Sequence, residues 1–273
     1  MEKNLIVIDN FFERINYDYS NQNIVSALNE FAKSYDLLTH IEMIVLKLSS
    51  VTDLDSTELR PNKIILKEEN GYELSIFYSL PNHTEDAQRV LYSHPSDLFL
   101  CPIFNMKDSK INVFYQKNNL EENKLDLEAK LIHKCSREVL ANSTLHIEKF
   151  KSLYEFDKTK FFIAYSLSKT NSLSSYSWEY NLDTLKPTRL VISDLRLGRI
   201  MTSIKILGMS NSKESIKNLI SLTNHKEHII RWEAVRAIIN IDFLKGKEIL
   251  QNMLVDPHPE ICNAAKKSLI QIN

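Results

Sequence analysis

Glycine is scarce in this sequence, with only four among 273 residues. Phosphate-binding loops of the GxGxxG and GxxxxGK[ST] types need closely spaced glycines, and neither motif occurs. The three cysteines, Cys101, Cys135 and Cys262, are odd in number and far apart, and no CxxC pair is present. A disulfide scaffold is therefore not expected, and a reducing compartment is.

Long apolar runs are also missing. No segment approaches the roughly 18 apolar residues that span a bilayer. The apolar run near the N-terminus is too short for a signal peptide, and Asp9 interrupts it. We expect a cytoplasmic protein with no membrane partner.

The sequence also lacks an excess of charge of either sign, since its formal net charge is −1. This balance gives the whole chain no attraction to nucleic acid, which we do not expect as a partner. A hydrophobic content of 43% with 25% charged residues is ordinary for a globular chain that buries a core. The length allows one large domain or two modest ones.

The first two thirds of the chain are rich in strand-length runs. Apolar residues spaced by three and four predict a helix over residues 23–38, and the same spacing from Leu127 to Val139 predicts a second helix. Between and after them, short β-branched and aromatic runs are bounded by Asn, Asp, Ser and Pro. These runs are Met43–Leu46, Lys63–Leu66, Glu73–Tyr78, Leu98–Phe104, Ile111–Tyr115, Leu145–Ile147, Phe161–Leu167, Ser175–Tyr180 and Leu190–Ile192. They predict a mainly β sandwich or barrel.

The pattern changes near Asp194, where helical periodicity begins. Four helical segments are expected, at residues 212–223, 227–241, 245–255 and 259–272, and residues 199–207 predict one more. A shift of 31 residues superposes Ile230, Ala234 and Ile238 on Ile261, Ala265 and Leu269.

The strings His228–Ala237 and Asp256–Ala265 resemble the second helices of HEAT repeats. The first string keeps the arginine of the HEAT pattern at Arg231, whereas the second has Cys262 at that position. The resemblance implies two HEAT-like hairpins. Because so short an array buries little surface by itself, it is expected to pack on the β domain or to bind a protein partner.

The β region resembles a cupin, a double-stranded β-helix barrel, through Tyr92–Phe104, Ile111–Tyr115, Leu145–Ile147 and Phe161–Leu167. Metal-binding cupins carry an HxH pair, a later Glu and a further His, because alternate strand residues point into the barrel. Here His94 is flanked by Tyr92 and Ser96 instead of histidines. The resemblance thus implies a degenerate metal motif, with His94 and His146, helped by Asp97 or Tyr92, as the remaining candidate ligands.

Other candidate sites compete with that one. His83-Thr-Glu85 with His133 or His146 imitates the facial triad of iron oxygenases. Cys101 is interpreted as a core residue, and Cys135 as a small residue on the buried face of its helix. Tyr176, Trp178 and Tyr180 share a strand face, which is either core packing or an aromatic platform, and core packing is favoured.

The sequence therefore predicts an α+β multidomain chain: a cupin-like barrel with flanking helices over residues 1–195, and HEAT-like hairpins over residues 196–273. The first hypothesis is a non-catalytic protein that binds a partner, or a small ligand through Tyr92, Ser96, Tyr165 and Trp178, with no cofactor. The second is a non-heme oxygenase that holds Fe(II) or another divalent metal on His94 and His146.

Overall fold

The chain divides into two compact units, after Val191. The computed structural model describes residues 2–50, 59–60, 62–81, 89–118, 121–157, 159–171 and 173–272. The sequence-based division lies close by, after residue 195. Among the described residues no helix is both long and apolar enough to cross a membrane.

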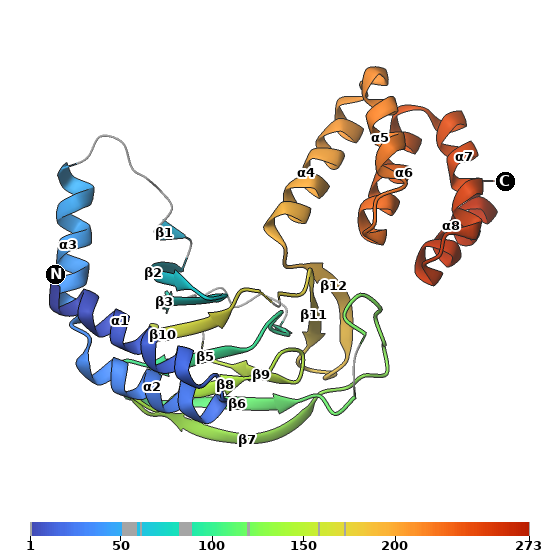
Figure 1. The fold of residues 1–273 in the computed structure, drawn as a ribbon. Helices are drawn as coiled ribbons and strands as arrows, with labels where there is room; N and C mark the ends of the chain where they lie inside the picture. Colours follow the sequence, from blue (N-terminus) through green and yellow to red (C-terminus); the bar gives the residue numbers. More distant parts are fainter. Residues whose placement is uncertain are drawn as a thin grey trace. The chain divides into compact units, whose positions relative to one another are not determined.

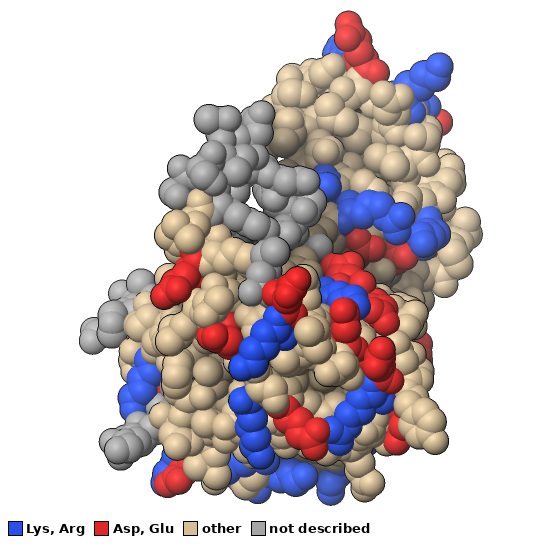
Figure 2. Space-filling view, turned by 60° about the vertical axis from the view of Figure 1, so that its left-hand side comes forward, with Lys and Arg blue, Asp and Glu red and all other residues tan. Residues whose placement is uncertain are grey.

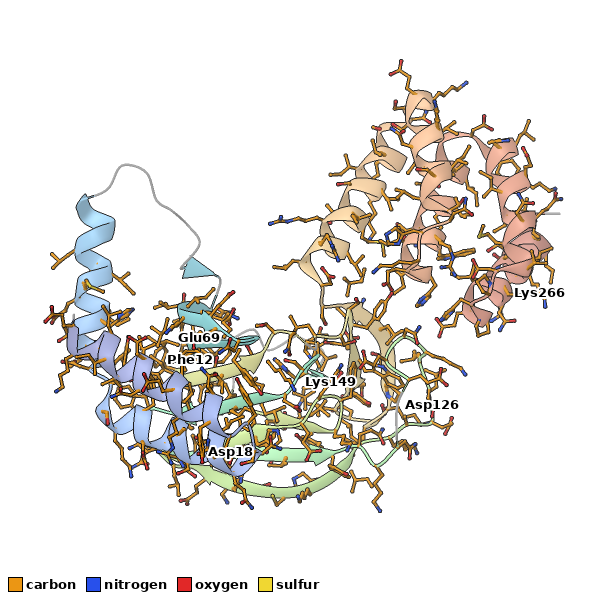
Figure 3. All side chains as sticks on the ribbon, viewed as in Figure 1. Phe12, Asp18, Glu69, Asp126, Lys149 and Lys266 are labelled. Atoms are coloured by element: carbon orange, nitrogen blue, oxygen red, sulfur yellow. The ribbon has the colours of Figure 1, made fainter. Side chains whose placement is uncertain are left out.

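Unit 1 begins with three helices, α1 (Glu2–Tyr17), α2 (Asn21–Ser34) and α3 (Leu37–Ser50). The predicted helix at residues 23–38 corresponds to α2, whose N-cap Ser20 accepts a hydrogen bond from the backbone N–H of Asn23. Both α1 and α2 bury one apolar face, and they lie along one side of the β-strands (Figure 1). Phe12 on α1 is labelled beside Glu69 at the end of β2 (Lys63–Glu69), and its ring is 1% exposed (Figure 3).

The predicted strand at Met43–Leu46 is wrong, because these residues belong to α3. Leu37, Ile41 and Ile44 recur at helical spacing and pack against the core that α1 and α2 share with the sheet. Helical burial of this face outweighs the strand preference of four β-branched and aliphatic residues.

Twelve strands follow among the described residues, and the pairs β1–β2, β2–β3, β3–β10, β10–β5, β5–β8, β11–β4, β6–β7 and β6–β9 are antiparallel. The largest sheet has the order β1-β2-β3-β10-β5-β8, and two three-stranded sheets have the orders β12-β11-β4 and β7-β6-β9. Besides β2, the strands are β1 (Leu59–Arg60), β3 (Tyr72–Ser79), β4 (Val90–Tyr92), β5 (Leu98–Pro102), β6 (Met106–Tyr115), β7 (Ile132–Val139), β8 (Leu145–Ile147), β9 (Ser152–Glu155), β10 (Phe162–Lys169), β11 (Tyr176–Asn181) and β12 (Pro187–Ile192).

The predicted helix between Leu127 and Val139 is also wrong. Residues 132–139 form β7, which pairs with β6 and leaves Ile132 and Cys135 exposed. The helical spacing of apolar residues was therefore accidental, because pairing with β6 decides the backbone of this segment.

The six-stranded sheet has an apolar core on each face. On the outer face, Ile15, Leu28 and Phe31 of the helices pack against Leu74, Phe99 and other strand residues. On the inner face, Leu100, Val113 and Phe162 belong to a core between this sheet and the β7-β6-β9 sheet. Burial of each such large side chain contributes about 2 kcal/mol relative to exposure. The unit is thus an antiparallel β-sandwich with helices covering one outer face.

Unit 2 is helical, with α4 (Leu195–Ser210), η1 (Lys213–Ser215), α5 (Ile216–Leu222), α6 (His228–Ile241), α7 (Phe243–Asn252), η2 (Met253–Val255) and α8 (Pro259–Ile272). Each helix expected from the sequence is present. The positions that the 31-residue shift superposes share one core, in which Ile230 and Ile238 are buried together with Ile261 and Ala265. Ala234 is fully buried as well.

Candidate ligand-binding cavity in the β domain

Strand β3 has two faces of different chemistry. Leu74 and Ile76 point outward into the core beneath the helices. Glu73 and Ser75, at the alternate positions, are 2% and 0% exposed and point to the inner side of the sheet. Residues on both faces of β3 are therefore buried, yet one face is polar.

Strand β10, which pairs with β3, repeats this arrangement. Tyr165 and Leu167 face the helices, whereas Ser166 and Ser168 face inward. Ser166 lies opposite Ser75, and their hydroxyl oxygens are 2.8 Å apart in a buried hydrogen bond. Buried hydroxyls are costly unless they are bonded in this way.

Three of these inward residues, Glu73, Ser166 and Ser168, border a cavity of about 780 Å³. Such a volume is within the range of sites that bind small organic molecules. One part of the wall is apolar, formed by Phe77, Leu91, Leu98, Leu100, Ile147, Phe156, Phe162 and Leu173. Another part is polar, formed by Asn62, Lys63, Glu68, Glu73, Ser79, His94, Ser96, Glu155, Asp157, Ser166, Ser168 and Thr170.

An ion pair between Lys63 and Glu73 marks the polar part of the wall. The Glu73 side chain is 3% exposed and that of Lys63 is 26% exposed. Removing a carboxylate from water is costly, and the ammonium of Lys63 offsets this cost. Four acidic residues line the cavity together with Lys63, namely Glu68, Glu73, Glu155 and Asp157.

His94 follows β4 and lines the same cavity. Its ring Nδ1 lies 2.7 Å from the carbonyl oxygen of Ser96, so we assign the N–H to Nδ1 as the donor. Burial lowers the pKa of His94 below its ordinary value of 6.5, against a smaller opposing effect of the Ser96 hydrogen bond. The imidazole is therefore neutral at neutral pH, and Nε2 has a lone pair that accepts a hydrogen bond.

Two of the predicted site residues, His94 and Ser96, line the cavity. Ser96 is fully buried there. Tyr165 does not line the cavity, because it faces the helices and its ring packs against Phe31 and Tyr35.

His146 faces away from the cavity. In the β5–β8 pairing it lies opposite Phe99, and the two rings stack with centroids 4.4 Å apart. Phe99 belongs to the core beneath the helices, whereas Leu98 and Ile147 line the cavity. Directly opposed residues point to the same face of a sheet, so the structure does not bring His146 to His94. His146 instead has its Nε2 3.8 Å from Oδ1 of Asp97.

Tyr92 and Trp178 also lie outside the cavity lining. Tyr92 is 50% exposed, and its hydroxyl donates a hydrogen bond to Glu179 over 3.0 Å. Trp178 is fully buried with Tyr180 in a separate apolar cluster. The burial of Tyr176, Trp178 and Tyr180 confirms the core-packing interpretation.

The other sequence candidates can be placed as well. His83 and Glu85 lie outside the described residues, and His133 is on the exposed face of β7. Cys101 is a core residue as predicted, and burial raises the pKa of its thiol. Cys135 is exposed on a strand, so its predicted place on a buried helix face is wrong.

Sequence reasoning missed most of the polar wall, including Lys63, Glu73, Ser166 and Ser168. The signal was present as polar residues at alternate positions of otherwise apolar strands, in Tyr72–Ser79 and Phe162–Lys169. Such alternation is ordinarily attributed to a solvent-facing side, and only the second layer of the fold shows that this side is closed.

Comparison with known proteins finds likeness in structure alone. No protein-family model matches the sequence, and no curated protein matches it. A protein with a double-stranded β-helix domain from Klebsiella pneumoniae has 11% identity and a TM-score of 0.25, covering 46% of this chain and 93% of its own. The Schizosaccharomyces pombe Cnp3 cupin domain has 13% identity and a TM-score of 0.25, with 44% and 69% covered.

A hydroquinone 1,2-dioxygenase, solved with Cd²⁺ and 4-hydroxybenzonitrile, has 9% identity and a TM-score of 0.28, with 54% and 78% covered. The folds named among these neighbours are the double-stranded β-helix and the cupin domain. Because the identities and TM-scores are this low, the likenesses carry no statement about substrate, cofactor or activity.

Proposed function

We propose that the β domain binds one small organic molecule in the cavity, as a cupin-like barrel without a catalytic metal. The observation that carries the proposal is the buried polar wall. Glu73, Ser96 and Ser166 line the cavity and are each at most 4% exposed, although an apolar core is expected on the inner side of the domain. Polar groups that converge on a cavity are typical of a site that orients a ligand.

The wall defines the kind of ligand. The apolar lining, with Phe77, Leu100 and Phe162, suits a ring or a short aliphatic body. Among the polar lining groups, His94 Nε2 and the carboxylates can accept hydrogen bonds, and the Lys63 ammonium can donate them. A ligand with a hydroxyl or amine group at one end fits this arrangement, because the lining acids outnumber the single lysine.

The oxygenase hypothesis makes a different demand on the same cavity. A metal centre needs three or more converging ligands. Within the described residues, the one group of His, Cys, Asp and Glu side chains with such convergence is His228, His258 and Glu260, none of which lines the cavity. This geometry favours ligand binding over metal catalysis in the β domain.

Native mass spectrometry combined with elemental analysis tests the proposal. The intact chain is purified under gentle conditions, and the bound small molecules and metals are compared with those of Ser168→Phe, which places a bulky ring in the cavity. We expect a mass increment of one small molecule per chain that is absent from the folded variant. Stoichiometric iron that is lost in a folded His94→Ala variant would instead support the oxygenase.

A further inference from the structure

Two equivalent turns in the helical unit bring three metal-ligating side chains together. His228 is the first residue of α6, and His258 directly precedes Pro259, the first residue of α8, in which Glu260 comes second. The 31-residue repeat brings the two turns into correspondence, since Ile230 and Ile261 occupy the same core. The imidazole rings of His228 and His258 stack with centroids 3.7 Å apart and planes 3° apart.

One ligand atom from each of the three side chains lies within 4.8 Å of the other two. His228 Nε2 and Glu260 Oε2 are 4.0 Å apart. His228 is 5% exposed, whereas the Glu260 side chain is 44% exposed. The cluster therefore has a fixed inner side and a side open to water.

Charged groups surround the cluster. Burial, with smaller contributions from His258 and Arg231, lowers the pKa of His228 to about 4. The positive charge of Arg231 is compensated by Asp256, because Nε and Nη2 donate hydrogen bonds of 2.8 and 2.6 Å to the two carboxylate oxygens of Asp256. Glu227 and Glu260 add two further acids near the turns.

The backbone of His258 is held firmly, whereas one of its ring atoms is not. The His258 N–H donates to Asp256 over 2.8 Å, and its carbonyl oxygen accepts from Ile261 and Cys262. Its ring Nδ1 is buried and has no hydrogen-bond partner in the described structure. A buried ring nitrogen without a partner destabilises the folded chain, and coordination of an ion would remove that cost.

We propose that His228, His258 and Glu260 bind a divalent transition-metal ion, with zinc as the ion that suits two imidazoles and a carboxylate. Tetrahedral coordination needs the three ligand atoms about 3.4 Å apart, given bond lengths of about 2.1 Å. The exposed Glu260 side chain moves inward, and the His258 ring turns out of the stack so that its lone pair points at the ion. The fourth position faces water, and the ion links the turn before α6 to the turn before α8.

Zinc titration of the intact, chelator-treated chain tests this site. Isothermal calorimetry should give one zinc per chain, and the affinity should fall about tenfold or more in His258→Ala and in Glu260→Gln. Cobalt should give a tetrahedral absorption spectrum that both variants lose. Circular dichroism checks that each variant is folded.

Two matched histidine variants locate the ion. His225 is in the same turn, where its Nδ1 accepts the backbone N–H of Glu227, but it is outside the ligand group. Zinc binding should therefore survive in His225→Ala, and in His94→Ala, which removes the histidine of the β-domain cavity. The absence of saturable zinc binding would overturn the proposal, as would unchanged affinity in folded His258→Ala or a loss confined to His94→Ala.

Discussion

At the scale of single residues, the cavity depends on buried polar side chains that compensate one another. Lys63 and Glu73 form an ion pair in which both partners line the cavity. His94 is held by Ser96, and Ser75 by Ser166. In each of these three pairs, one residue supplies the buried charge or hydrogen-bonding group that its partner needs.

Removing the cation of the buried ion pair should be more harmful than neutralising the acid. Lys63→Met leaves the Glu73 carboxylate buried without its ammonium, so we expect a loss of about 3 kcal/mol in the free energy of unfolding. Glu73→Gln leaves a quarter-exposed lysine that water can solvate, and its cost should be smaller. Urea denaturation of both variants measures the difference, and equal costs would contradict the burial argument.

His94 should make stability fall on the acidic side of neutrality. Its pKa in the folded chain is below the ordinary 6.5, so the unfolded chain takes up the proton first as the pH falls. The resulting loss of stability begins below about pH 6.5 and is absent above it. In His94→Gln the loss between about pH 7.5 and 5.5 should be reduced. Unfolding free energies at both pH values test this, and an unchanged loss would show that another group is responsible.

The residue scale also shows what the sequence could reveal of the site. His94 and Ser96 were found because the cupin resemblance placed them in a motif. Tyr165, Trp178 and His146 were misplaced with respect to the cavity, since strand alternation tells which residues share a face and not which face is hollow. Glu73 and Ser166 were missed for the same reason.

At the scale of elements, close approach of helices decides which substitutions are tolerated. Gly246 of α7 lies against α6, where an added Cβ would be 2.6 Å from the Cα of Ile239. Gly198 of α4 has no such atom within 4 Å. The two positions are both helical glycines, and they differ in the space beside them.

Gly246→Ala should therefore destabilise unit 2 by about 1–3 kcal/mol, since backbone must shift to admit the methyl group. Gly198→Ala should be neutral or stabilising by up to about 1 kcal/mol, because alanine has the higher helix propensity. Thermal unfolding of the two variants decides, and a stabilising Gly246→Ala would contradict the packing.

The elements that were predicted correctly are those with a long, consistent pattern. The α2 and unit 2 helices were found from apolar spacing, and most strands from β-branched runs. Residues Met43–Leu46 and Ile132–Val139 were assigned to the wrong class because short segments follow their neighbours, α1 and α2 in one case and β6 in the other. Helix α1 was missed, although Ile8, Phe11, Phe12 and Ile15 have helical spacing.

At the scale of the whole molecule, the described apolar cores of the two units share no residue. The core of unit 2 draws on residues from Ile192 onward, and the three cores of unit 1 lie before it. On the surface seen in Figure 2, basic and acidic side chains are interspersed. This agrees with the near-zero net charge and gives no broad patch of one sign on that face.

Separate cores should allow local unfolding. Gly246→Ala is expected to speed amide hydrogen exchange in α6, α7 and α8 while leaving β3 and β10 as protected as in the wild type. Exchange followed by mass spectrometry measures both regions in one sample. Faster exchange in the strands as well would show that the two units unfold together.

The central claim is that the β domain holds a small molecule in its cavity, and the most direct measurement is binding of a fragment panel. Each fragment has an apolar ring and one hydroxyl or amine, and thermal shift and native mass spectrometry are recorded for the wild type, Ser168→Phe and Tyr92→Phe. The account predicts fragments that bind the wild type and Tyr92→Phe one per chain, and that fail to bind the folded Ser168→Phe. Absence of binding across the panel, or equal binding to Ser168→Phe, would contradict it.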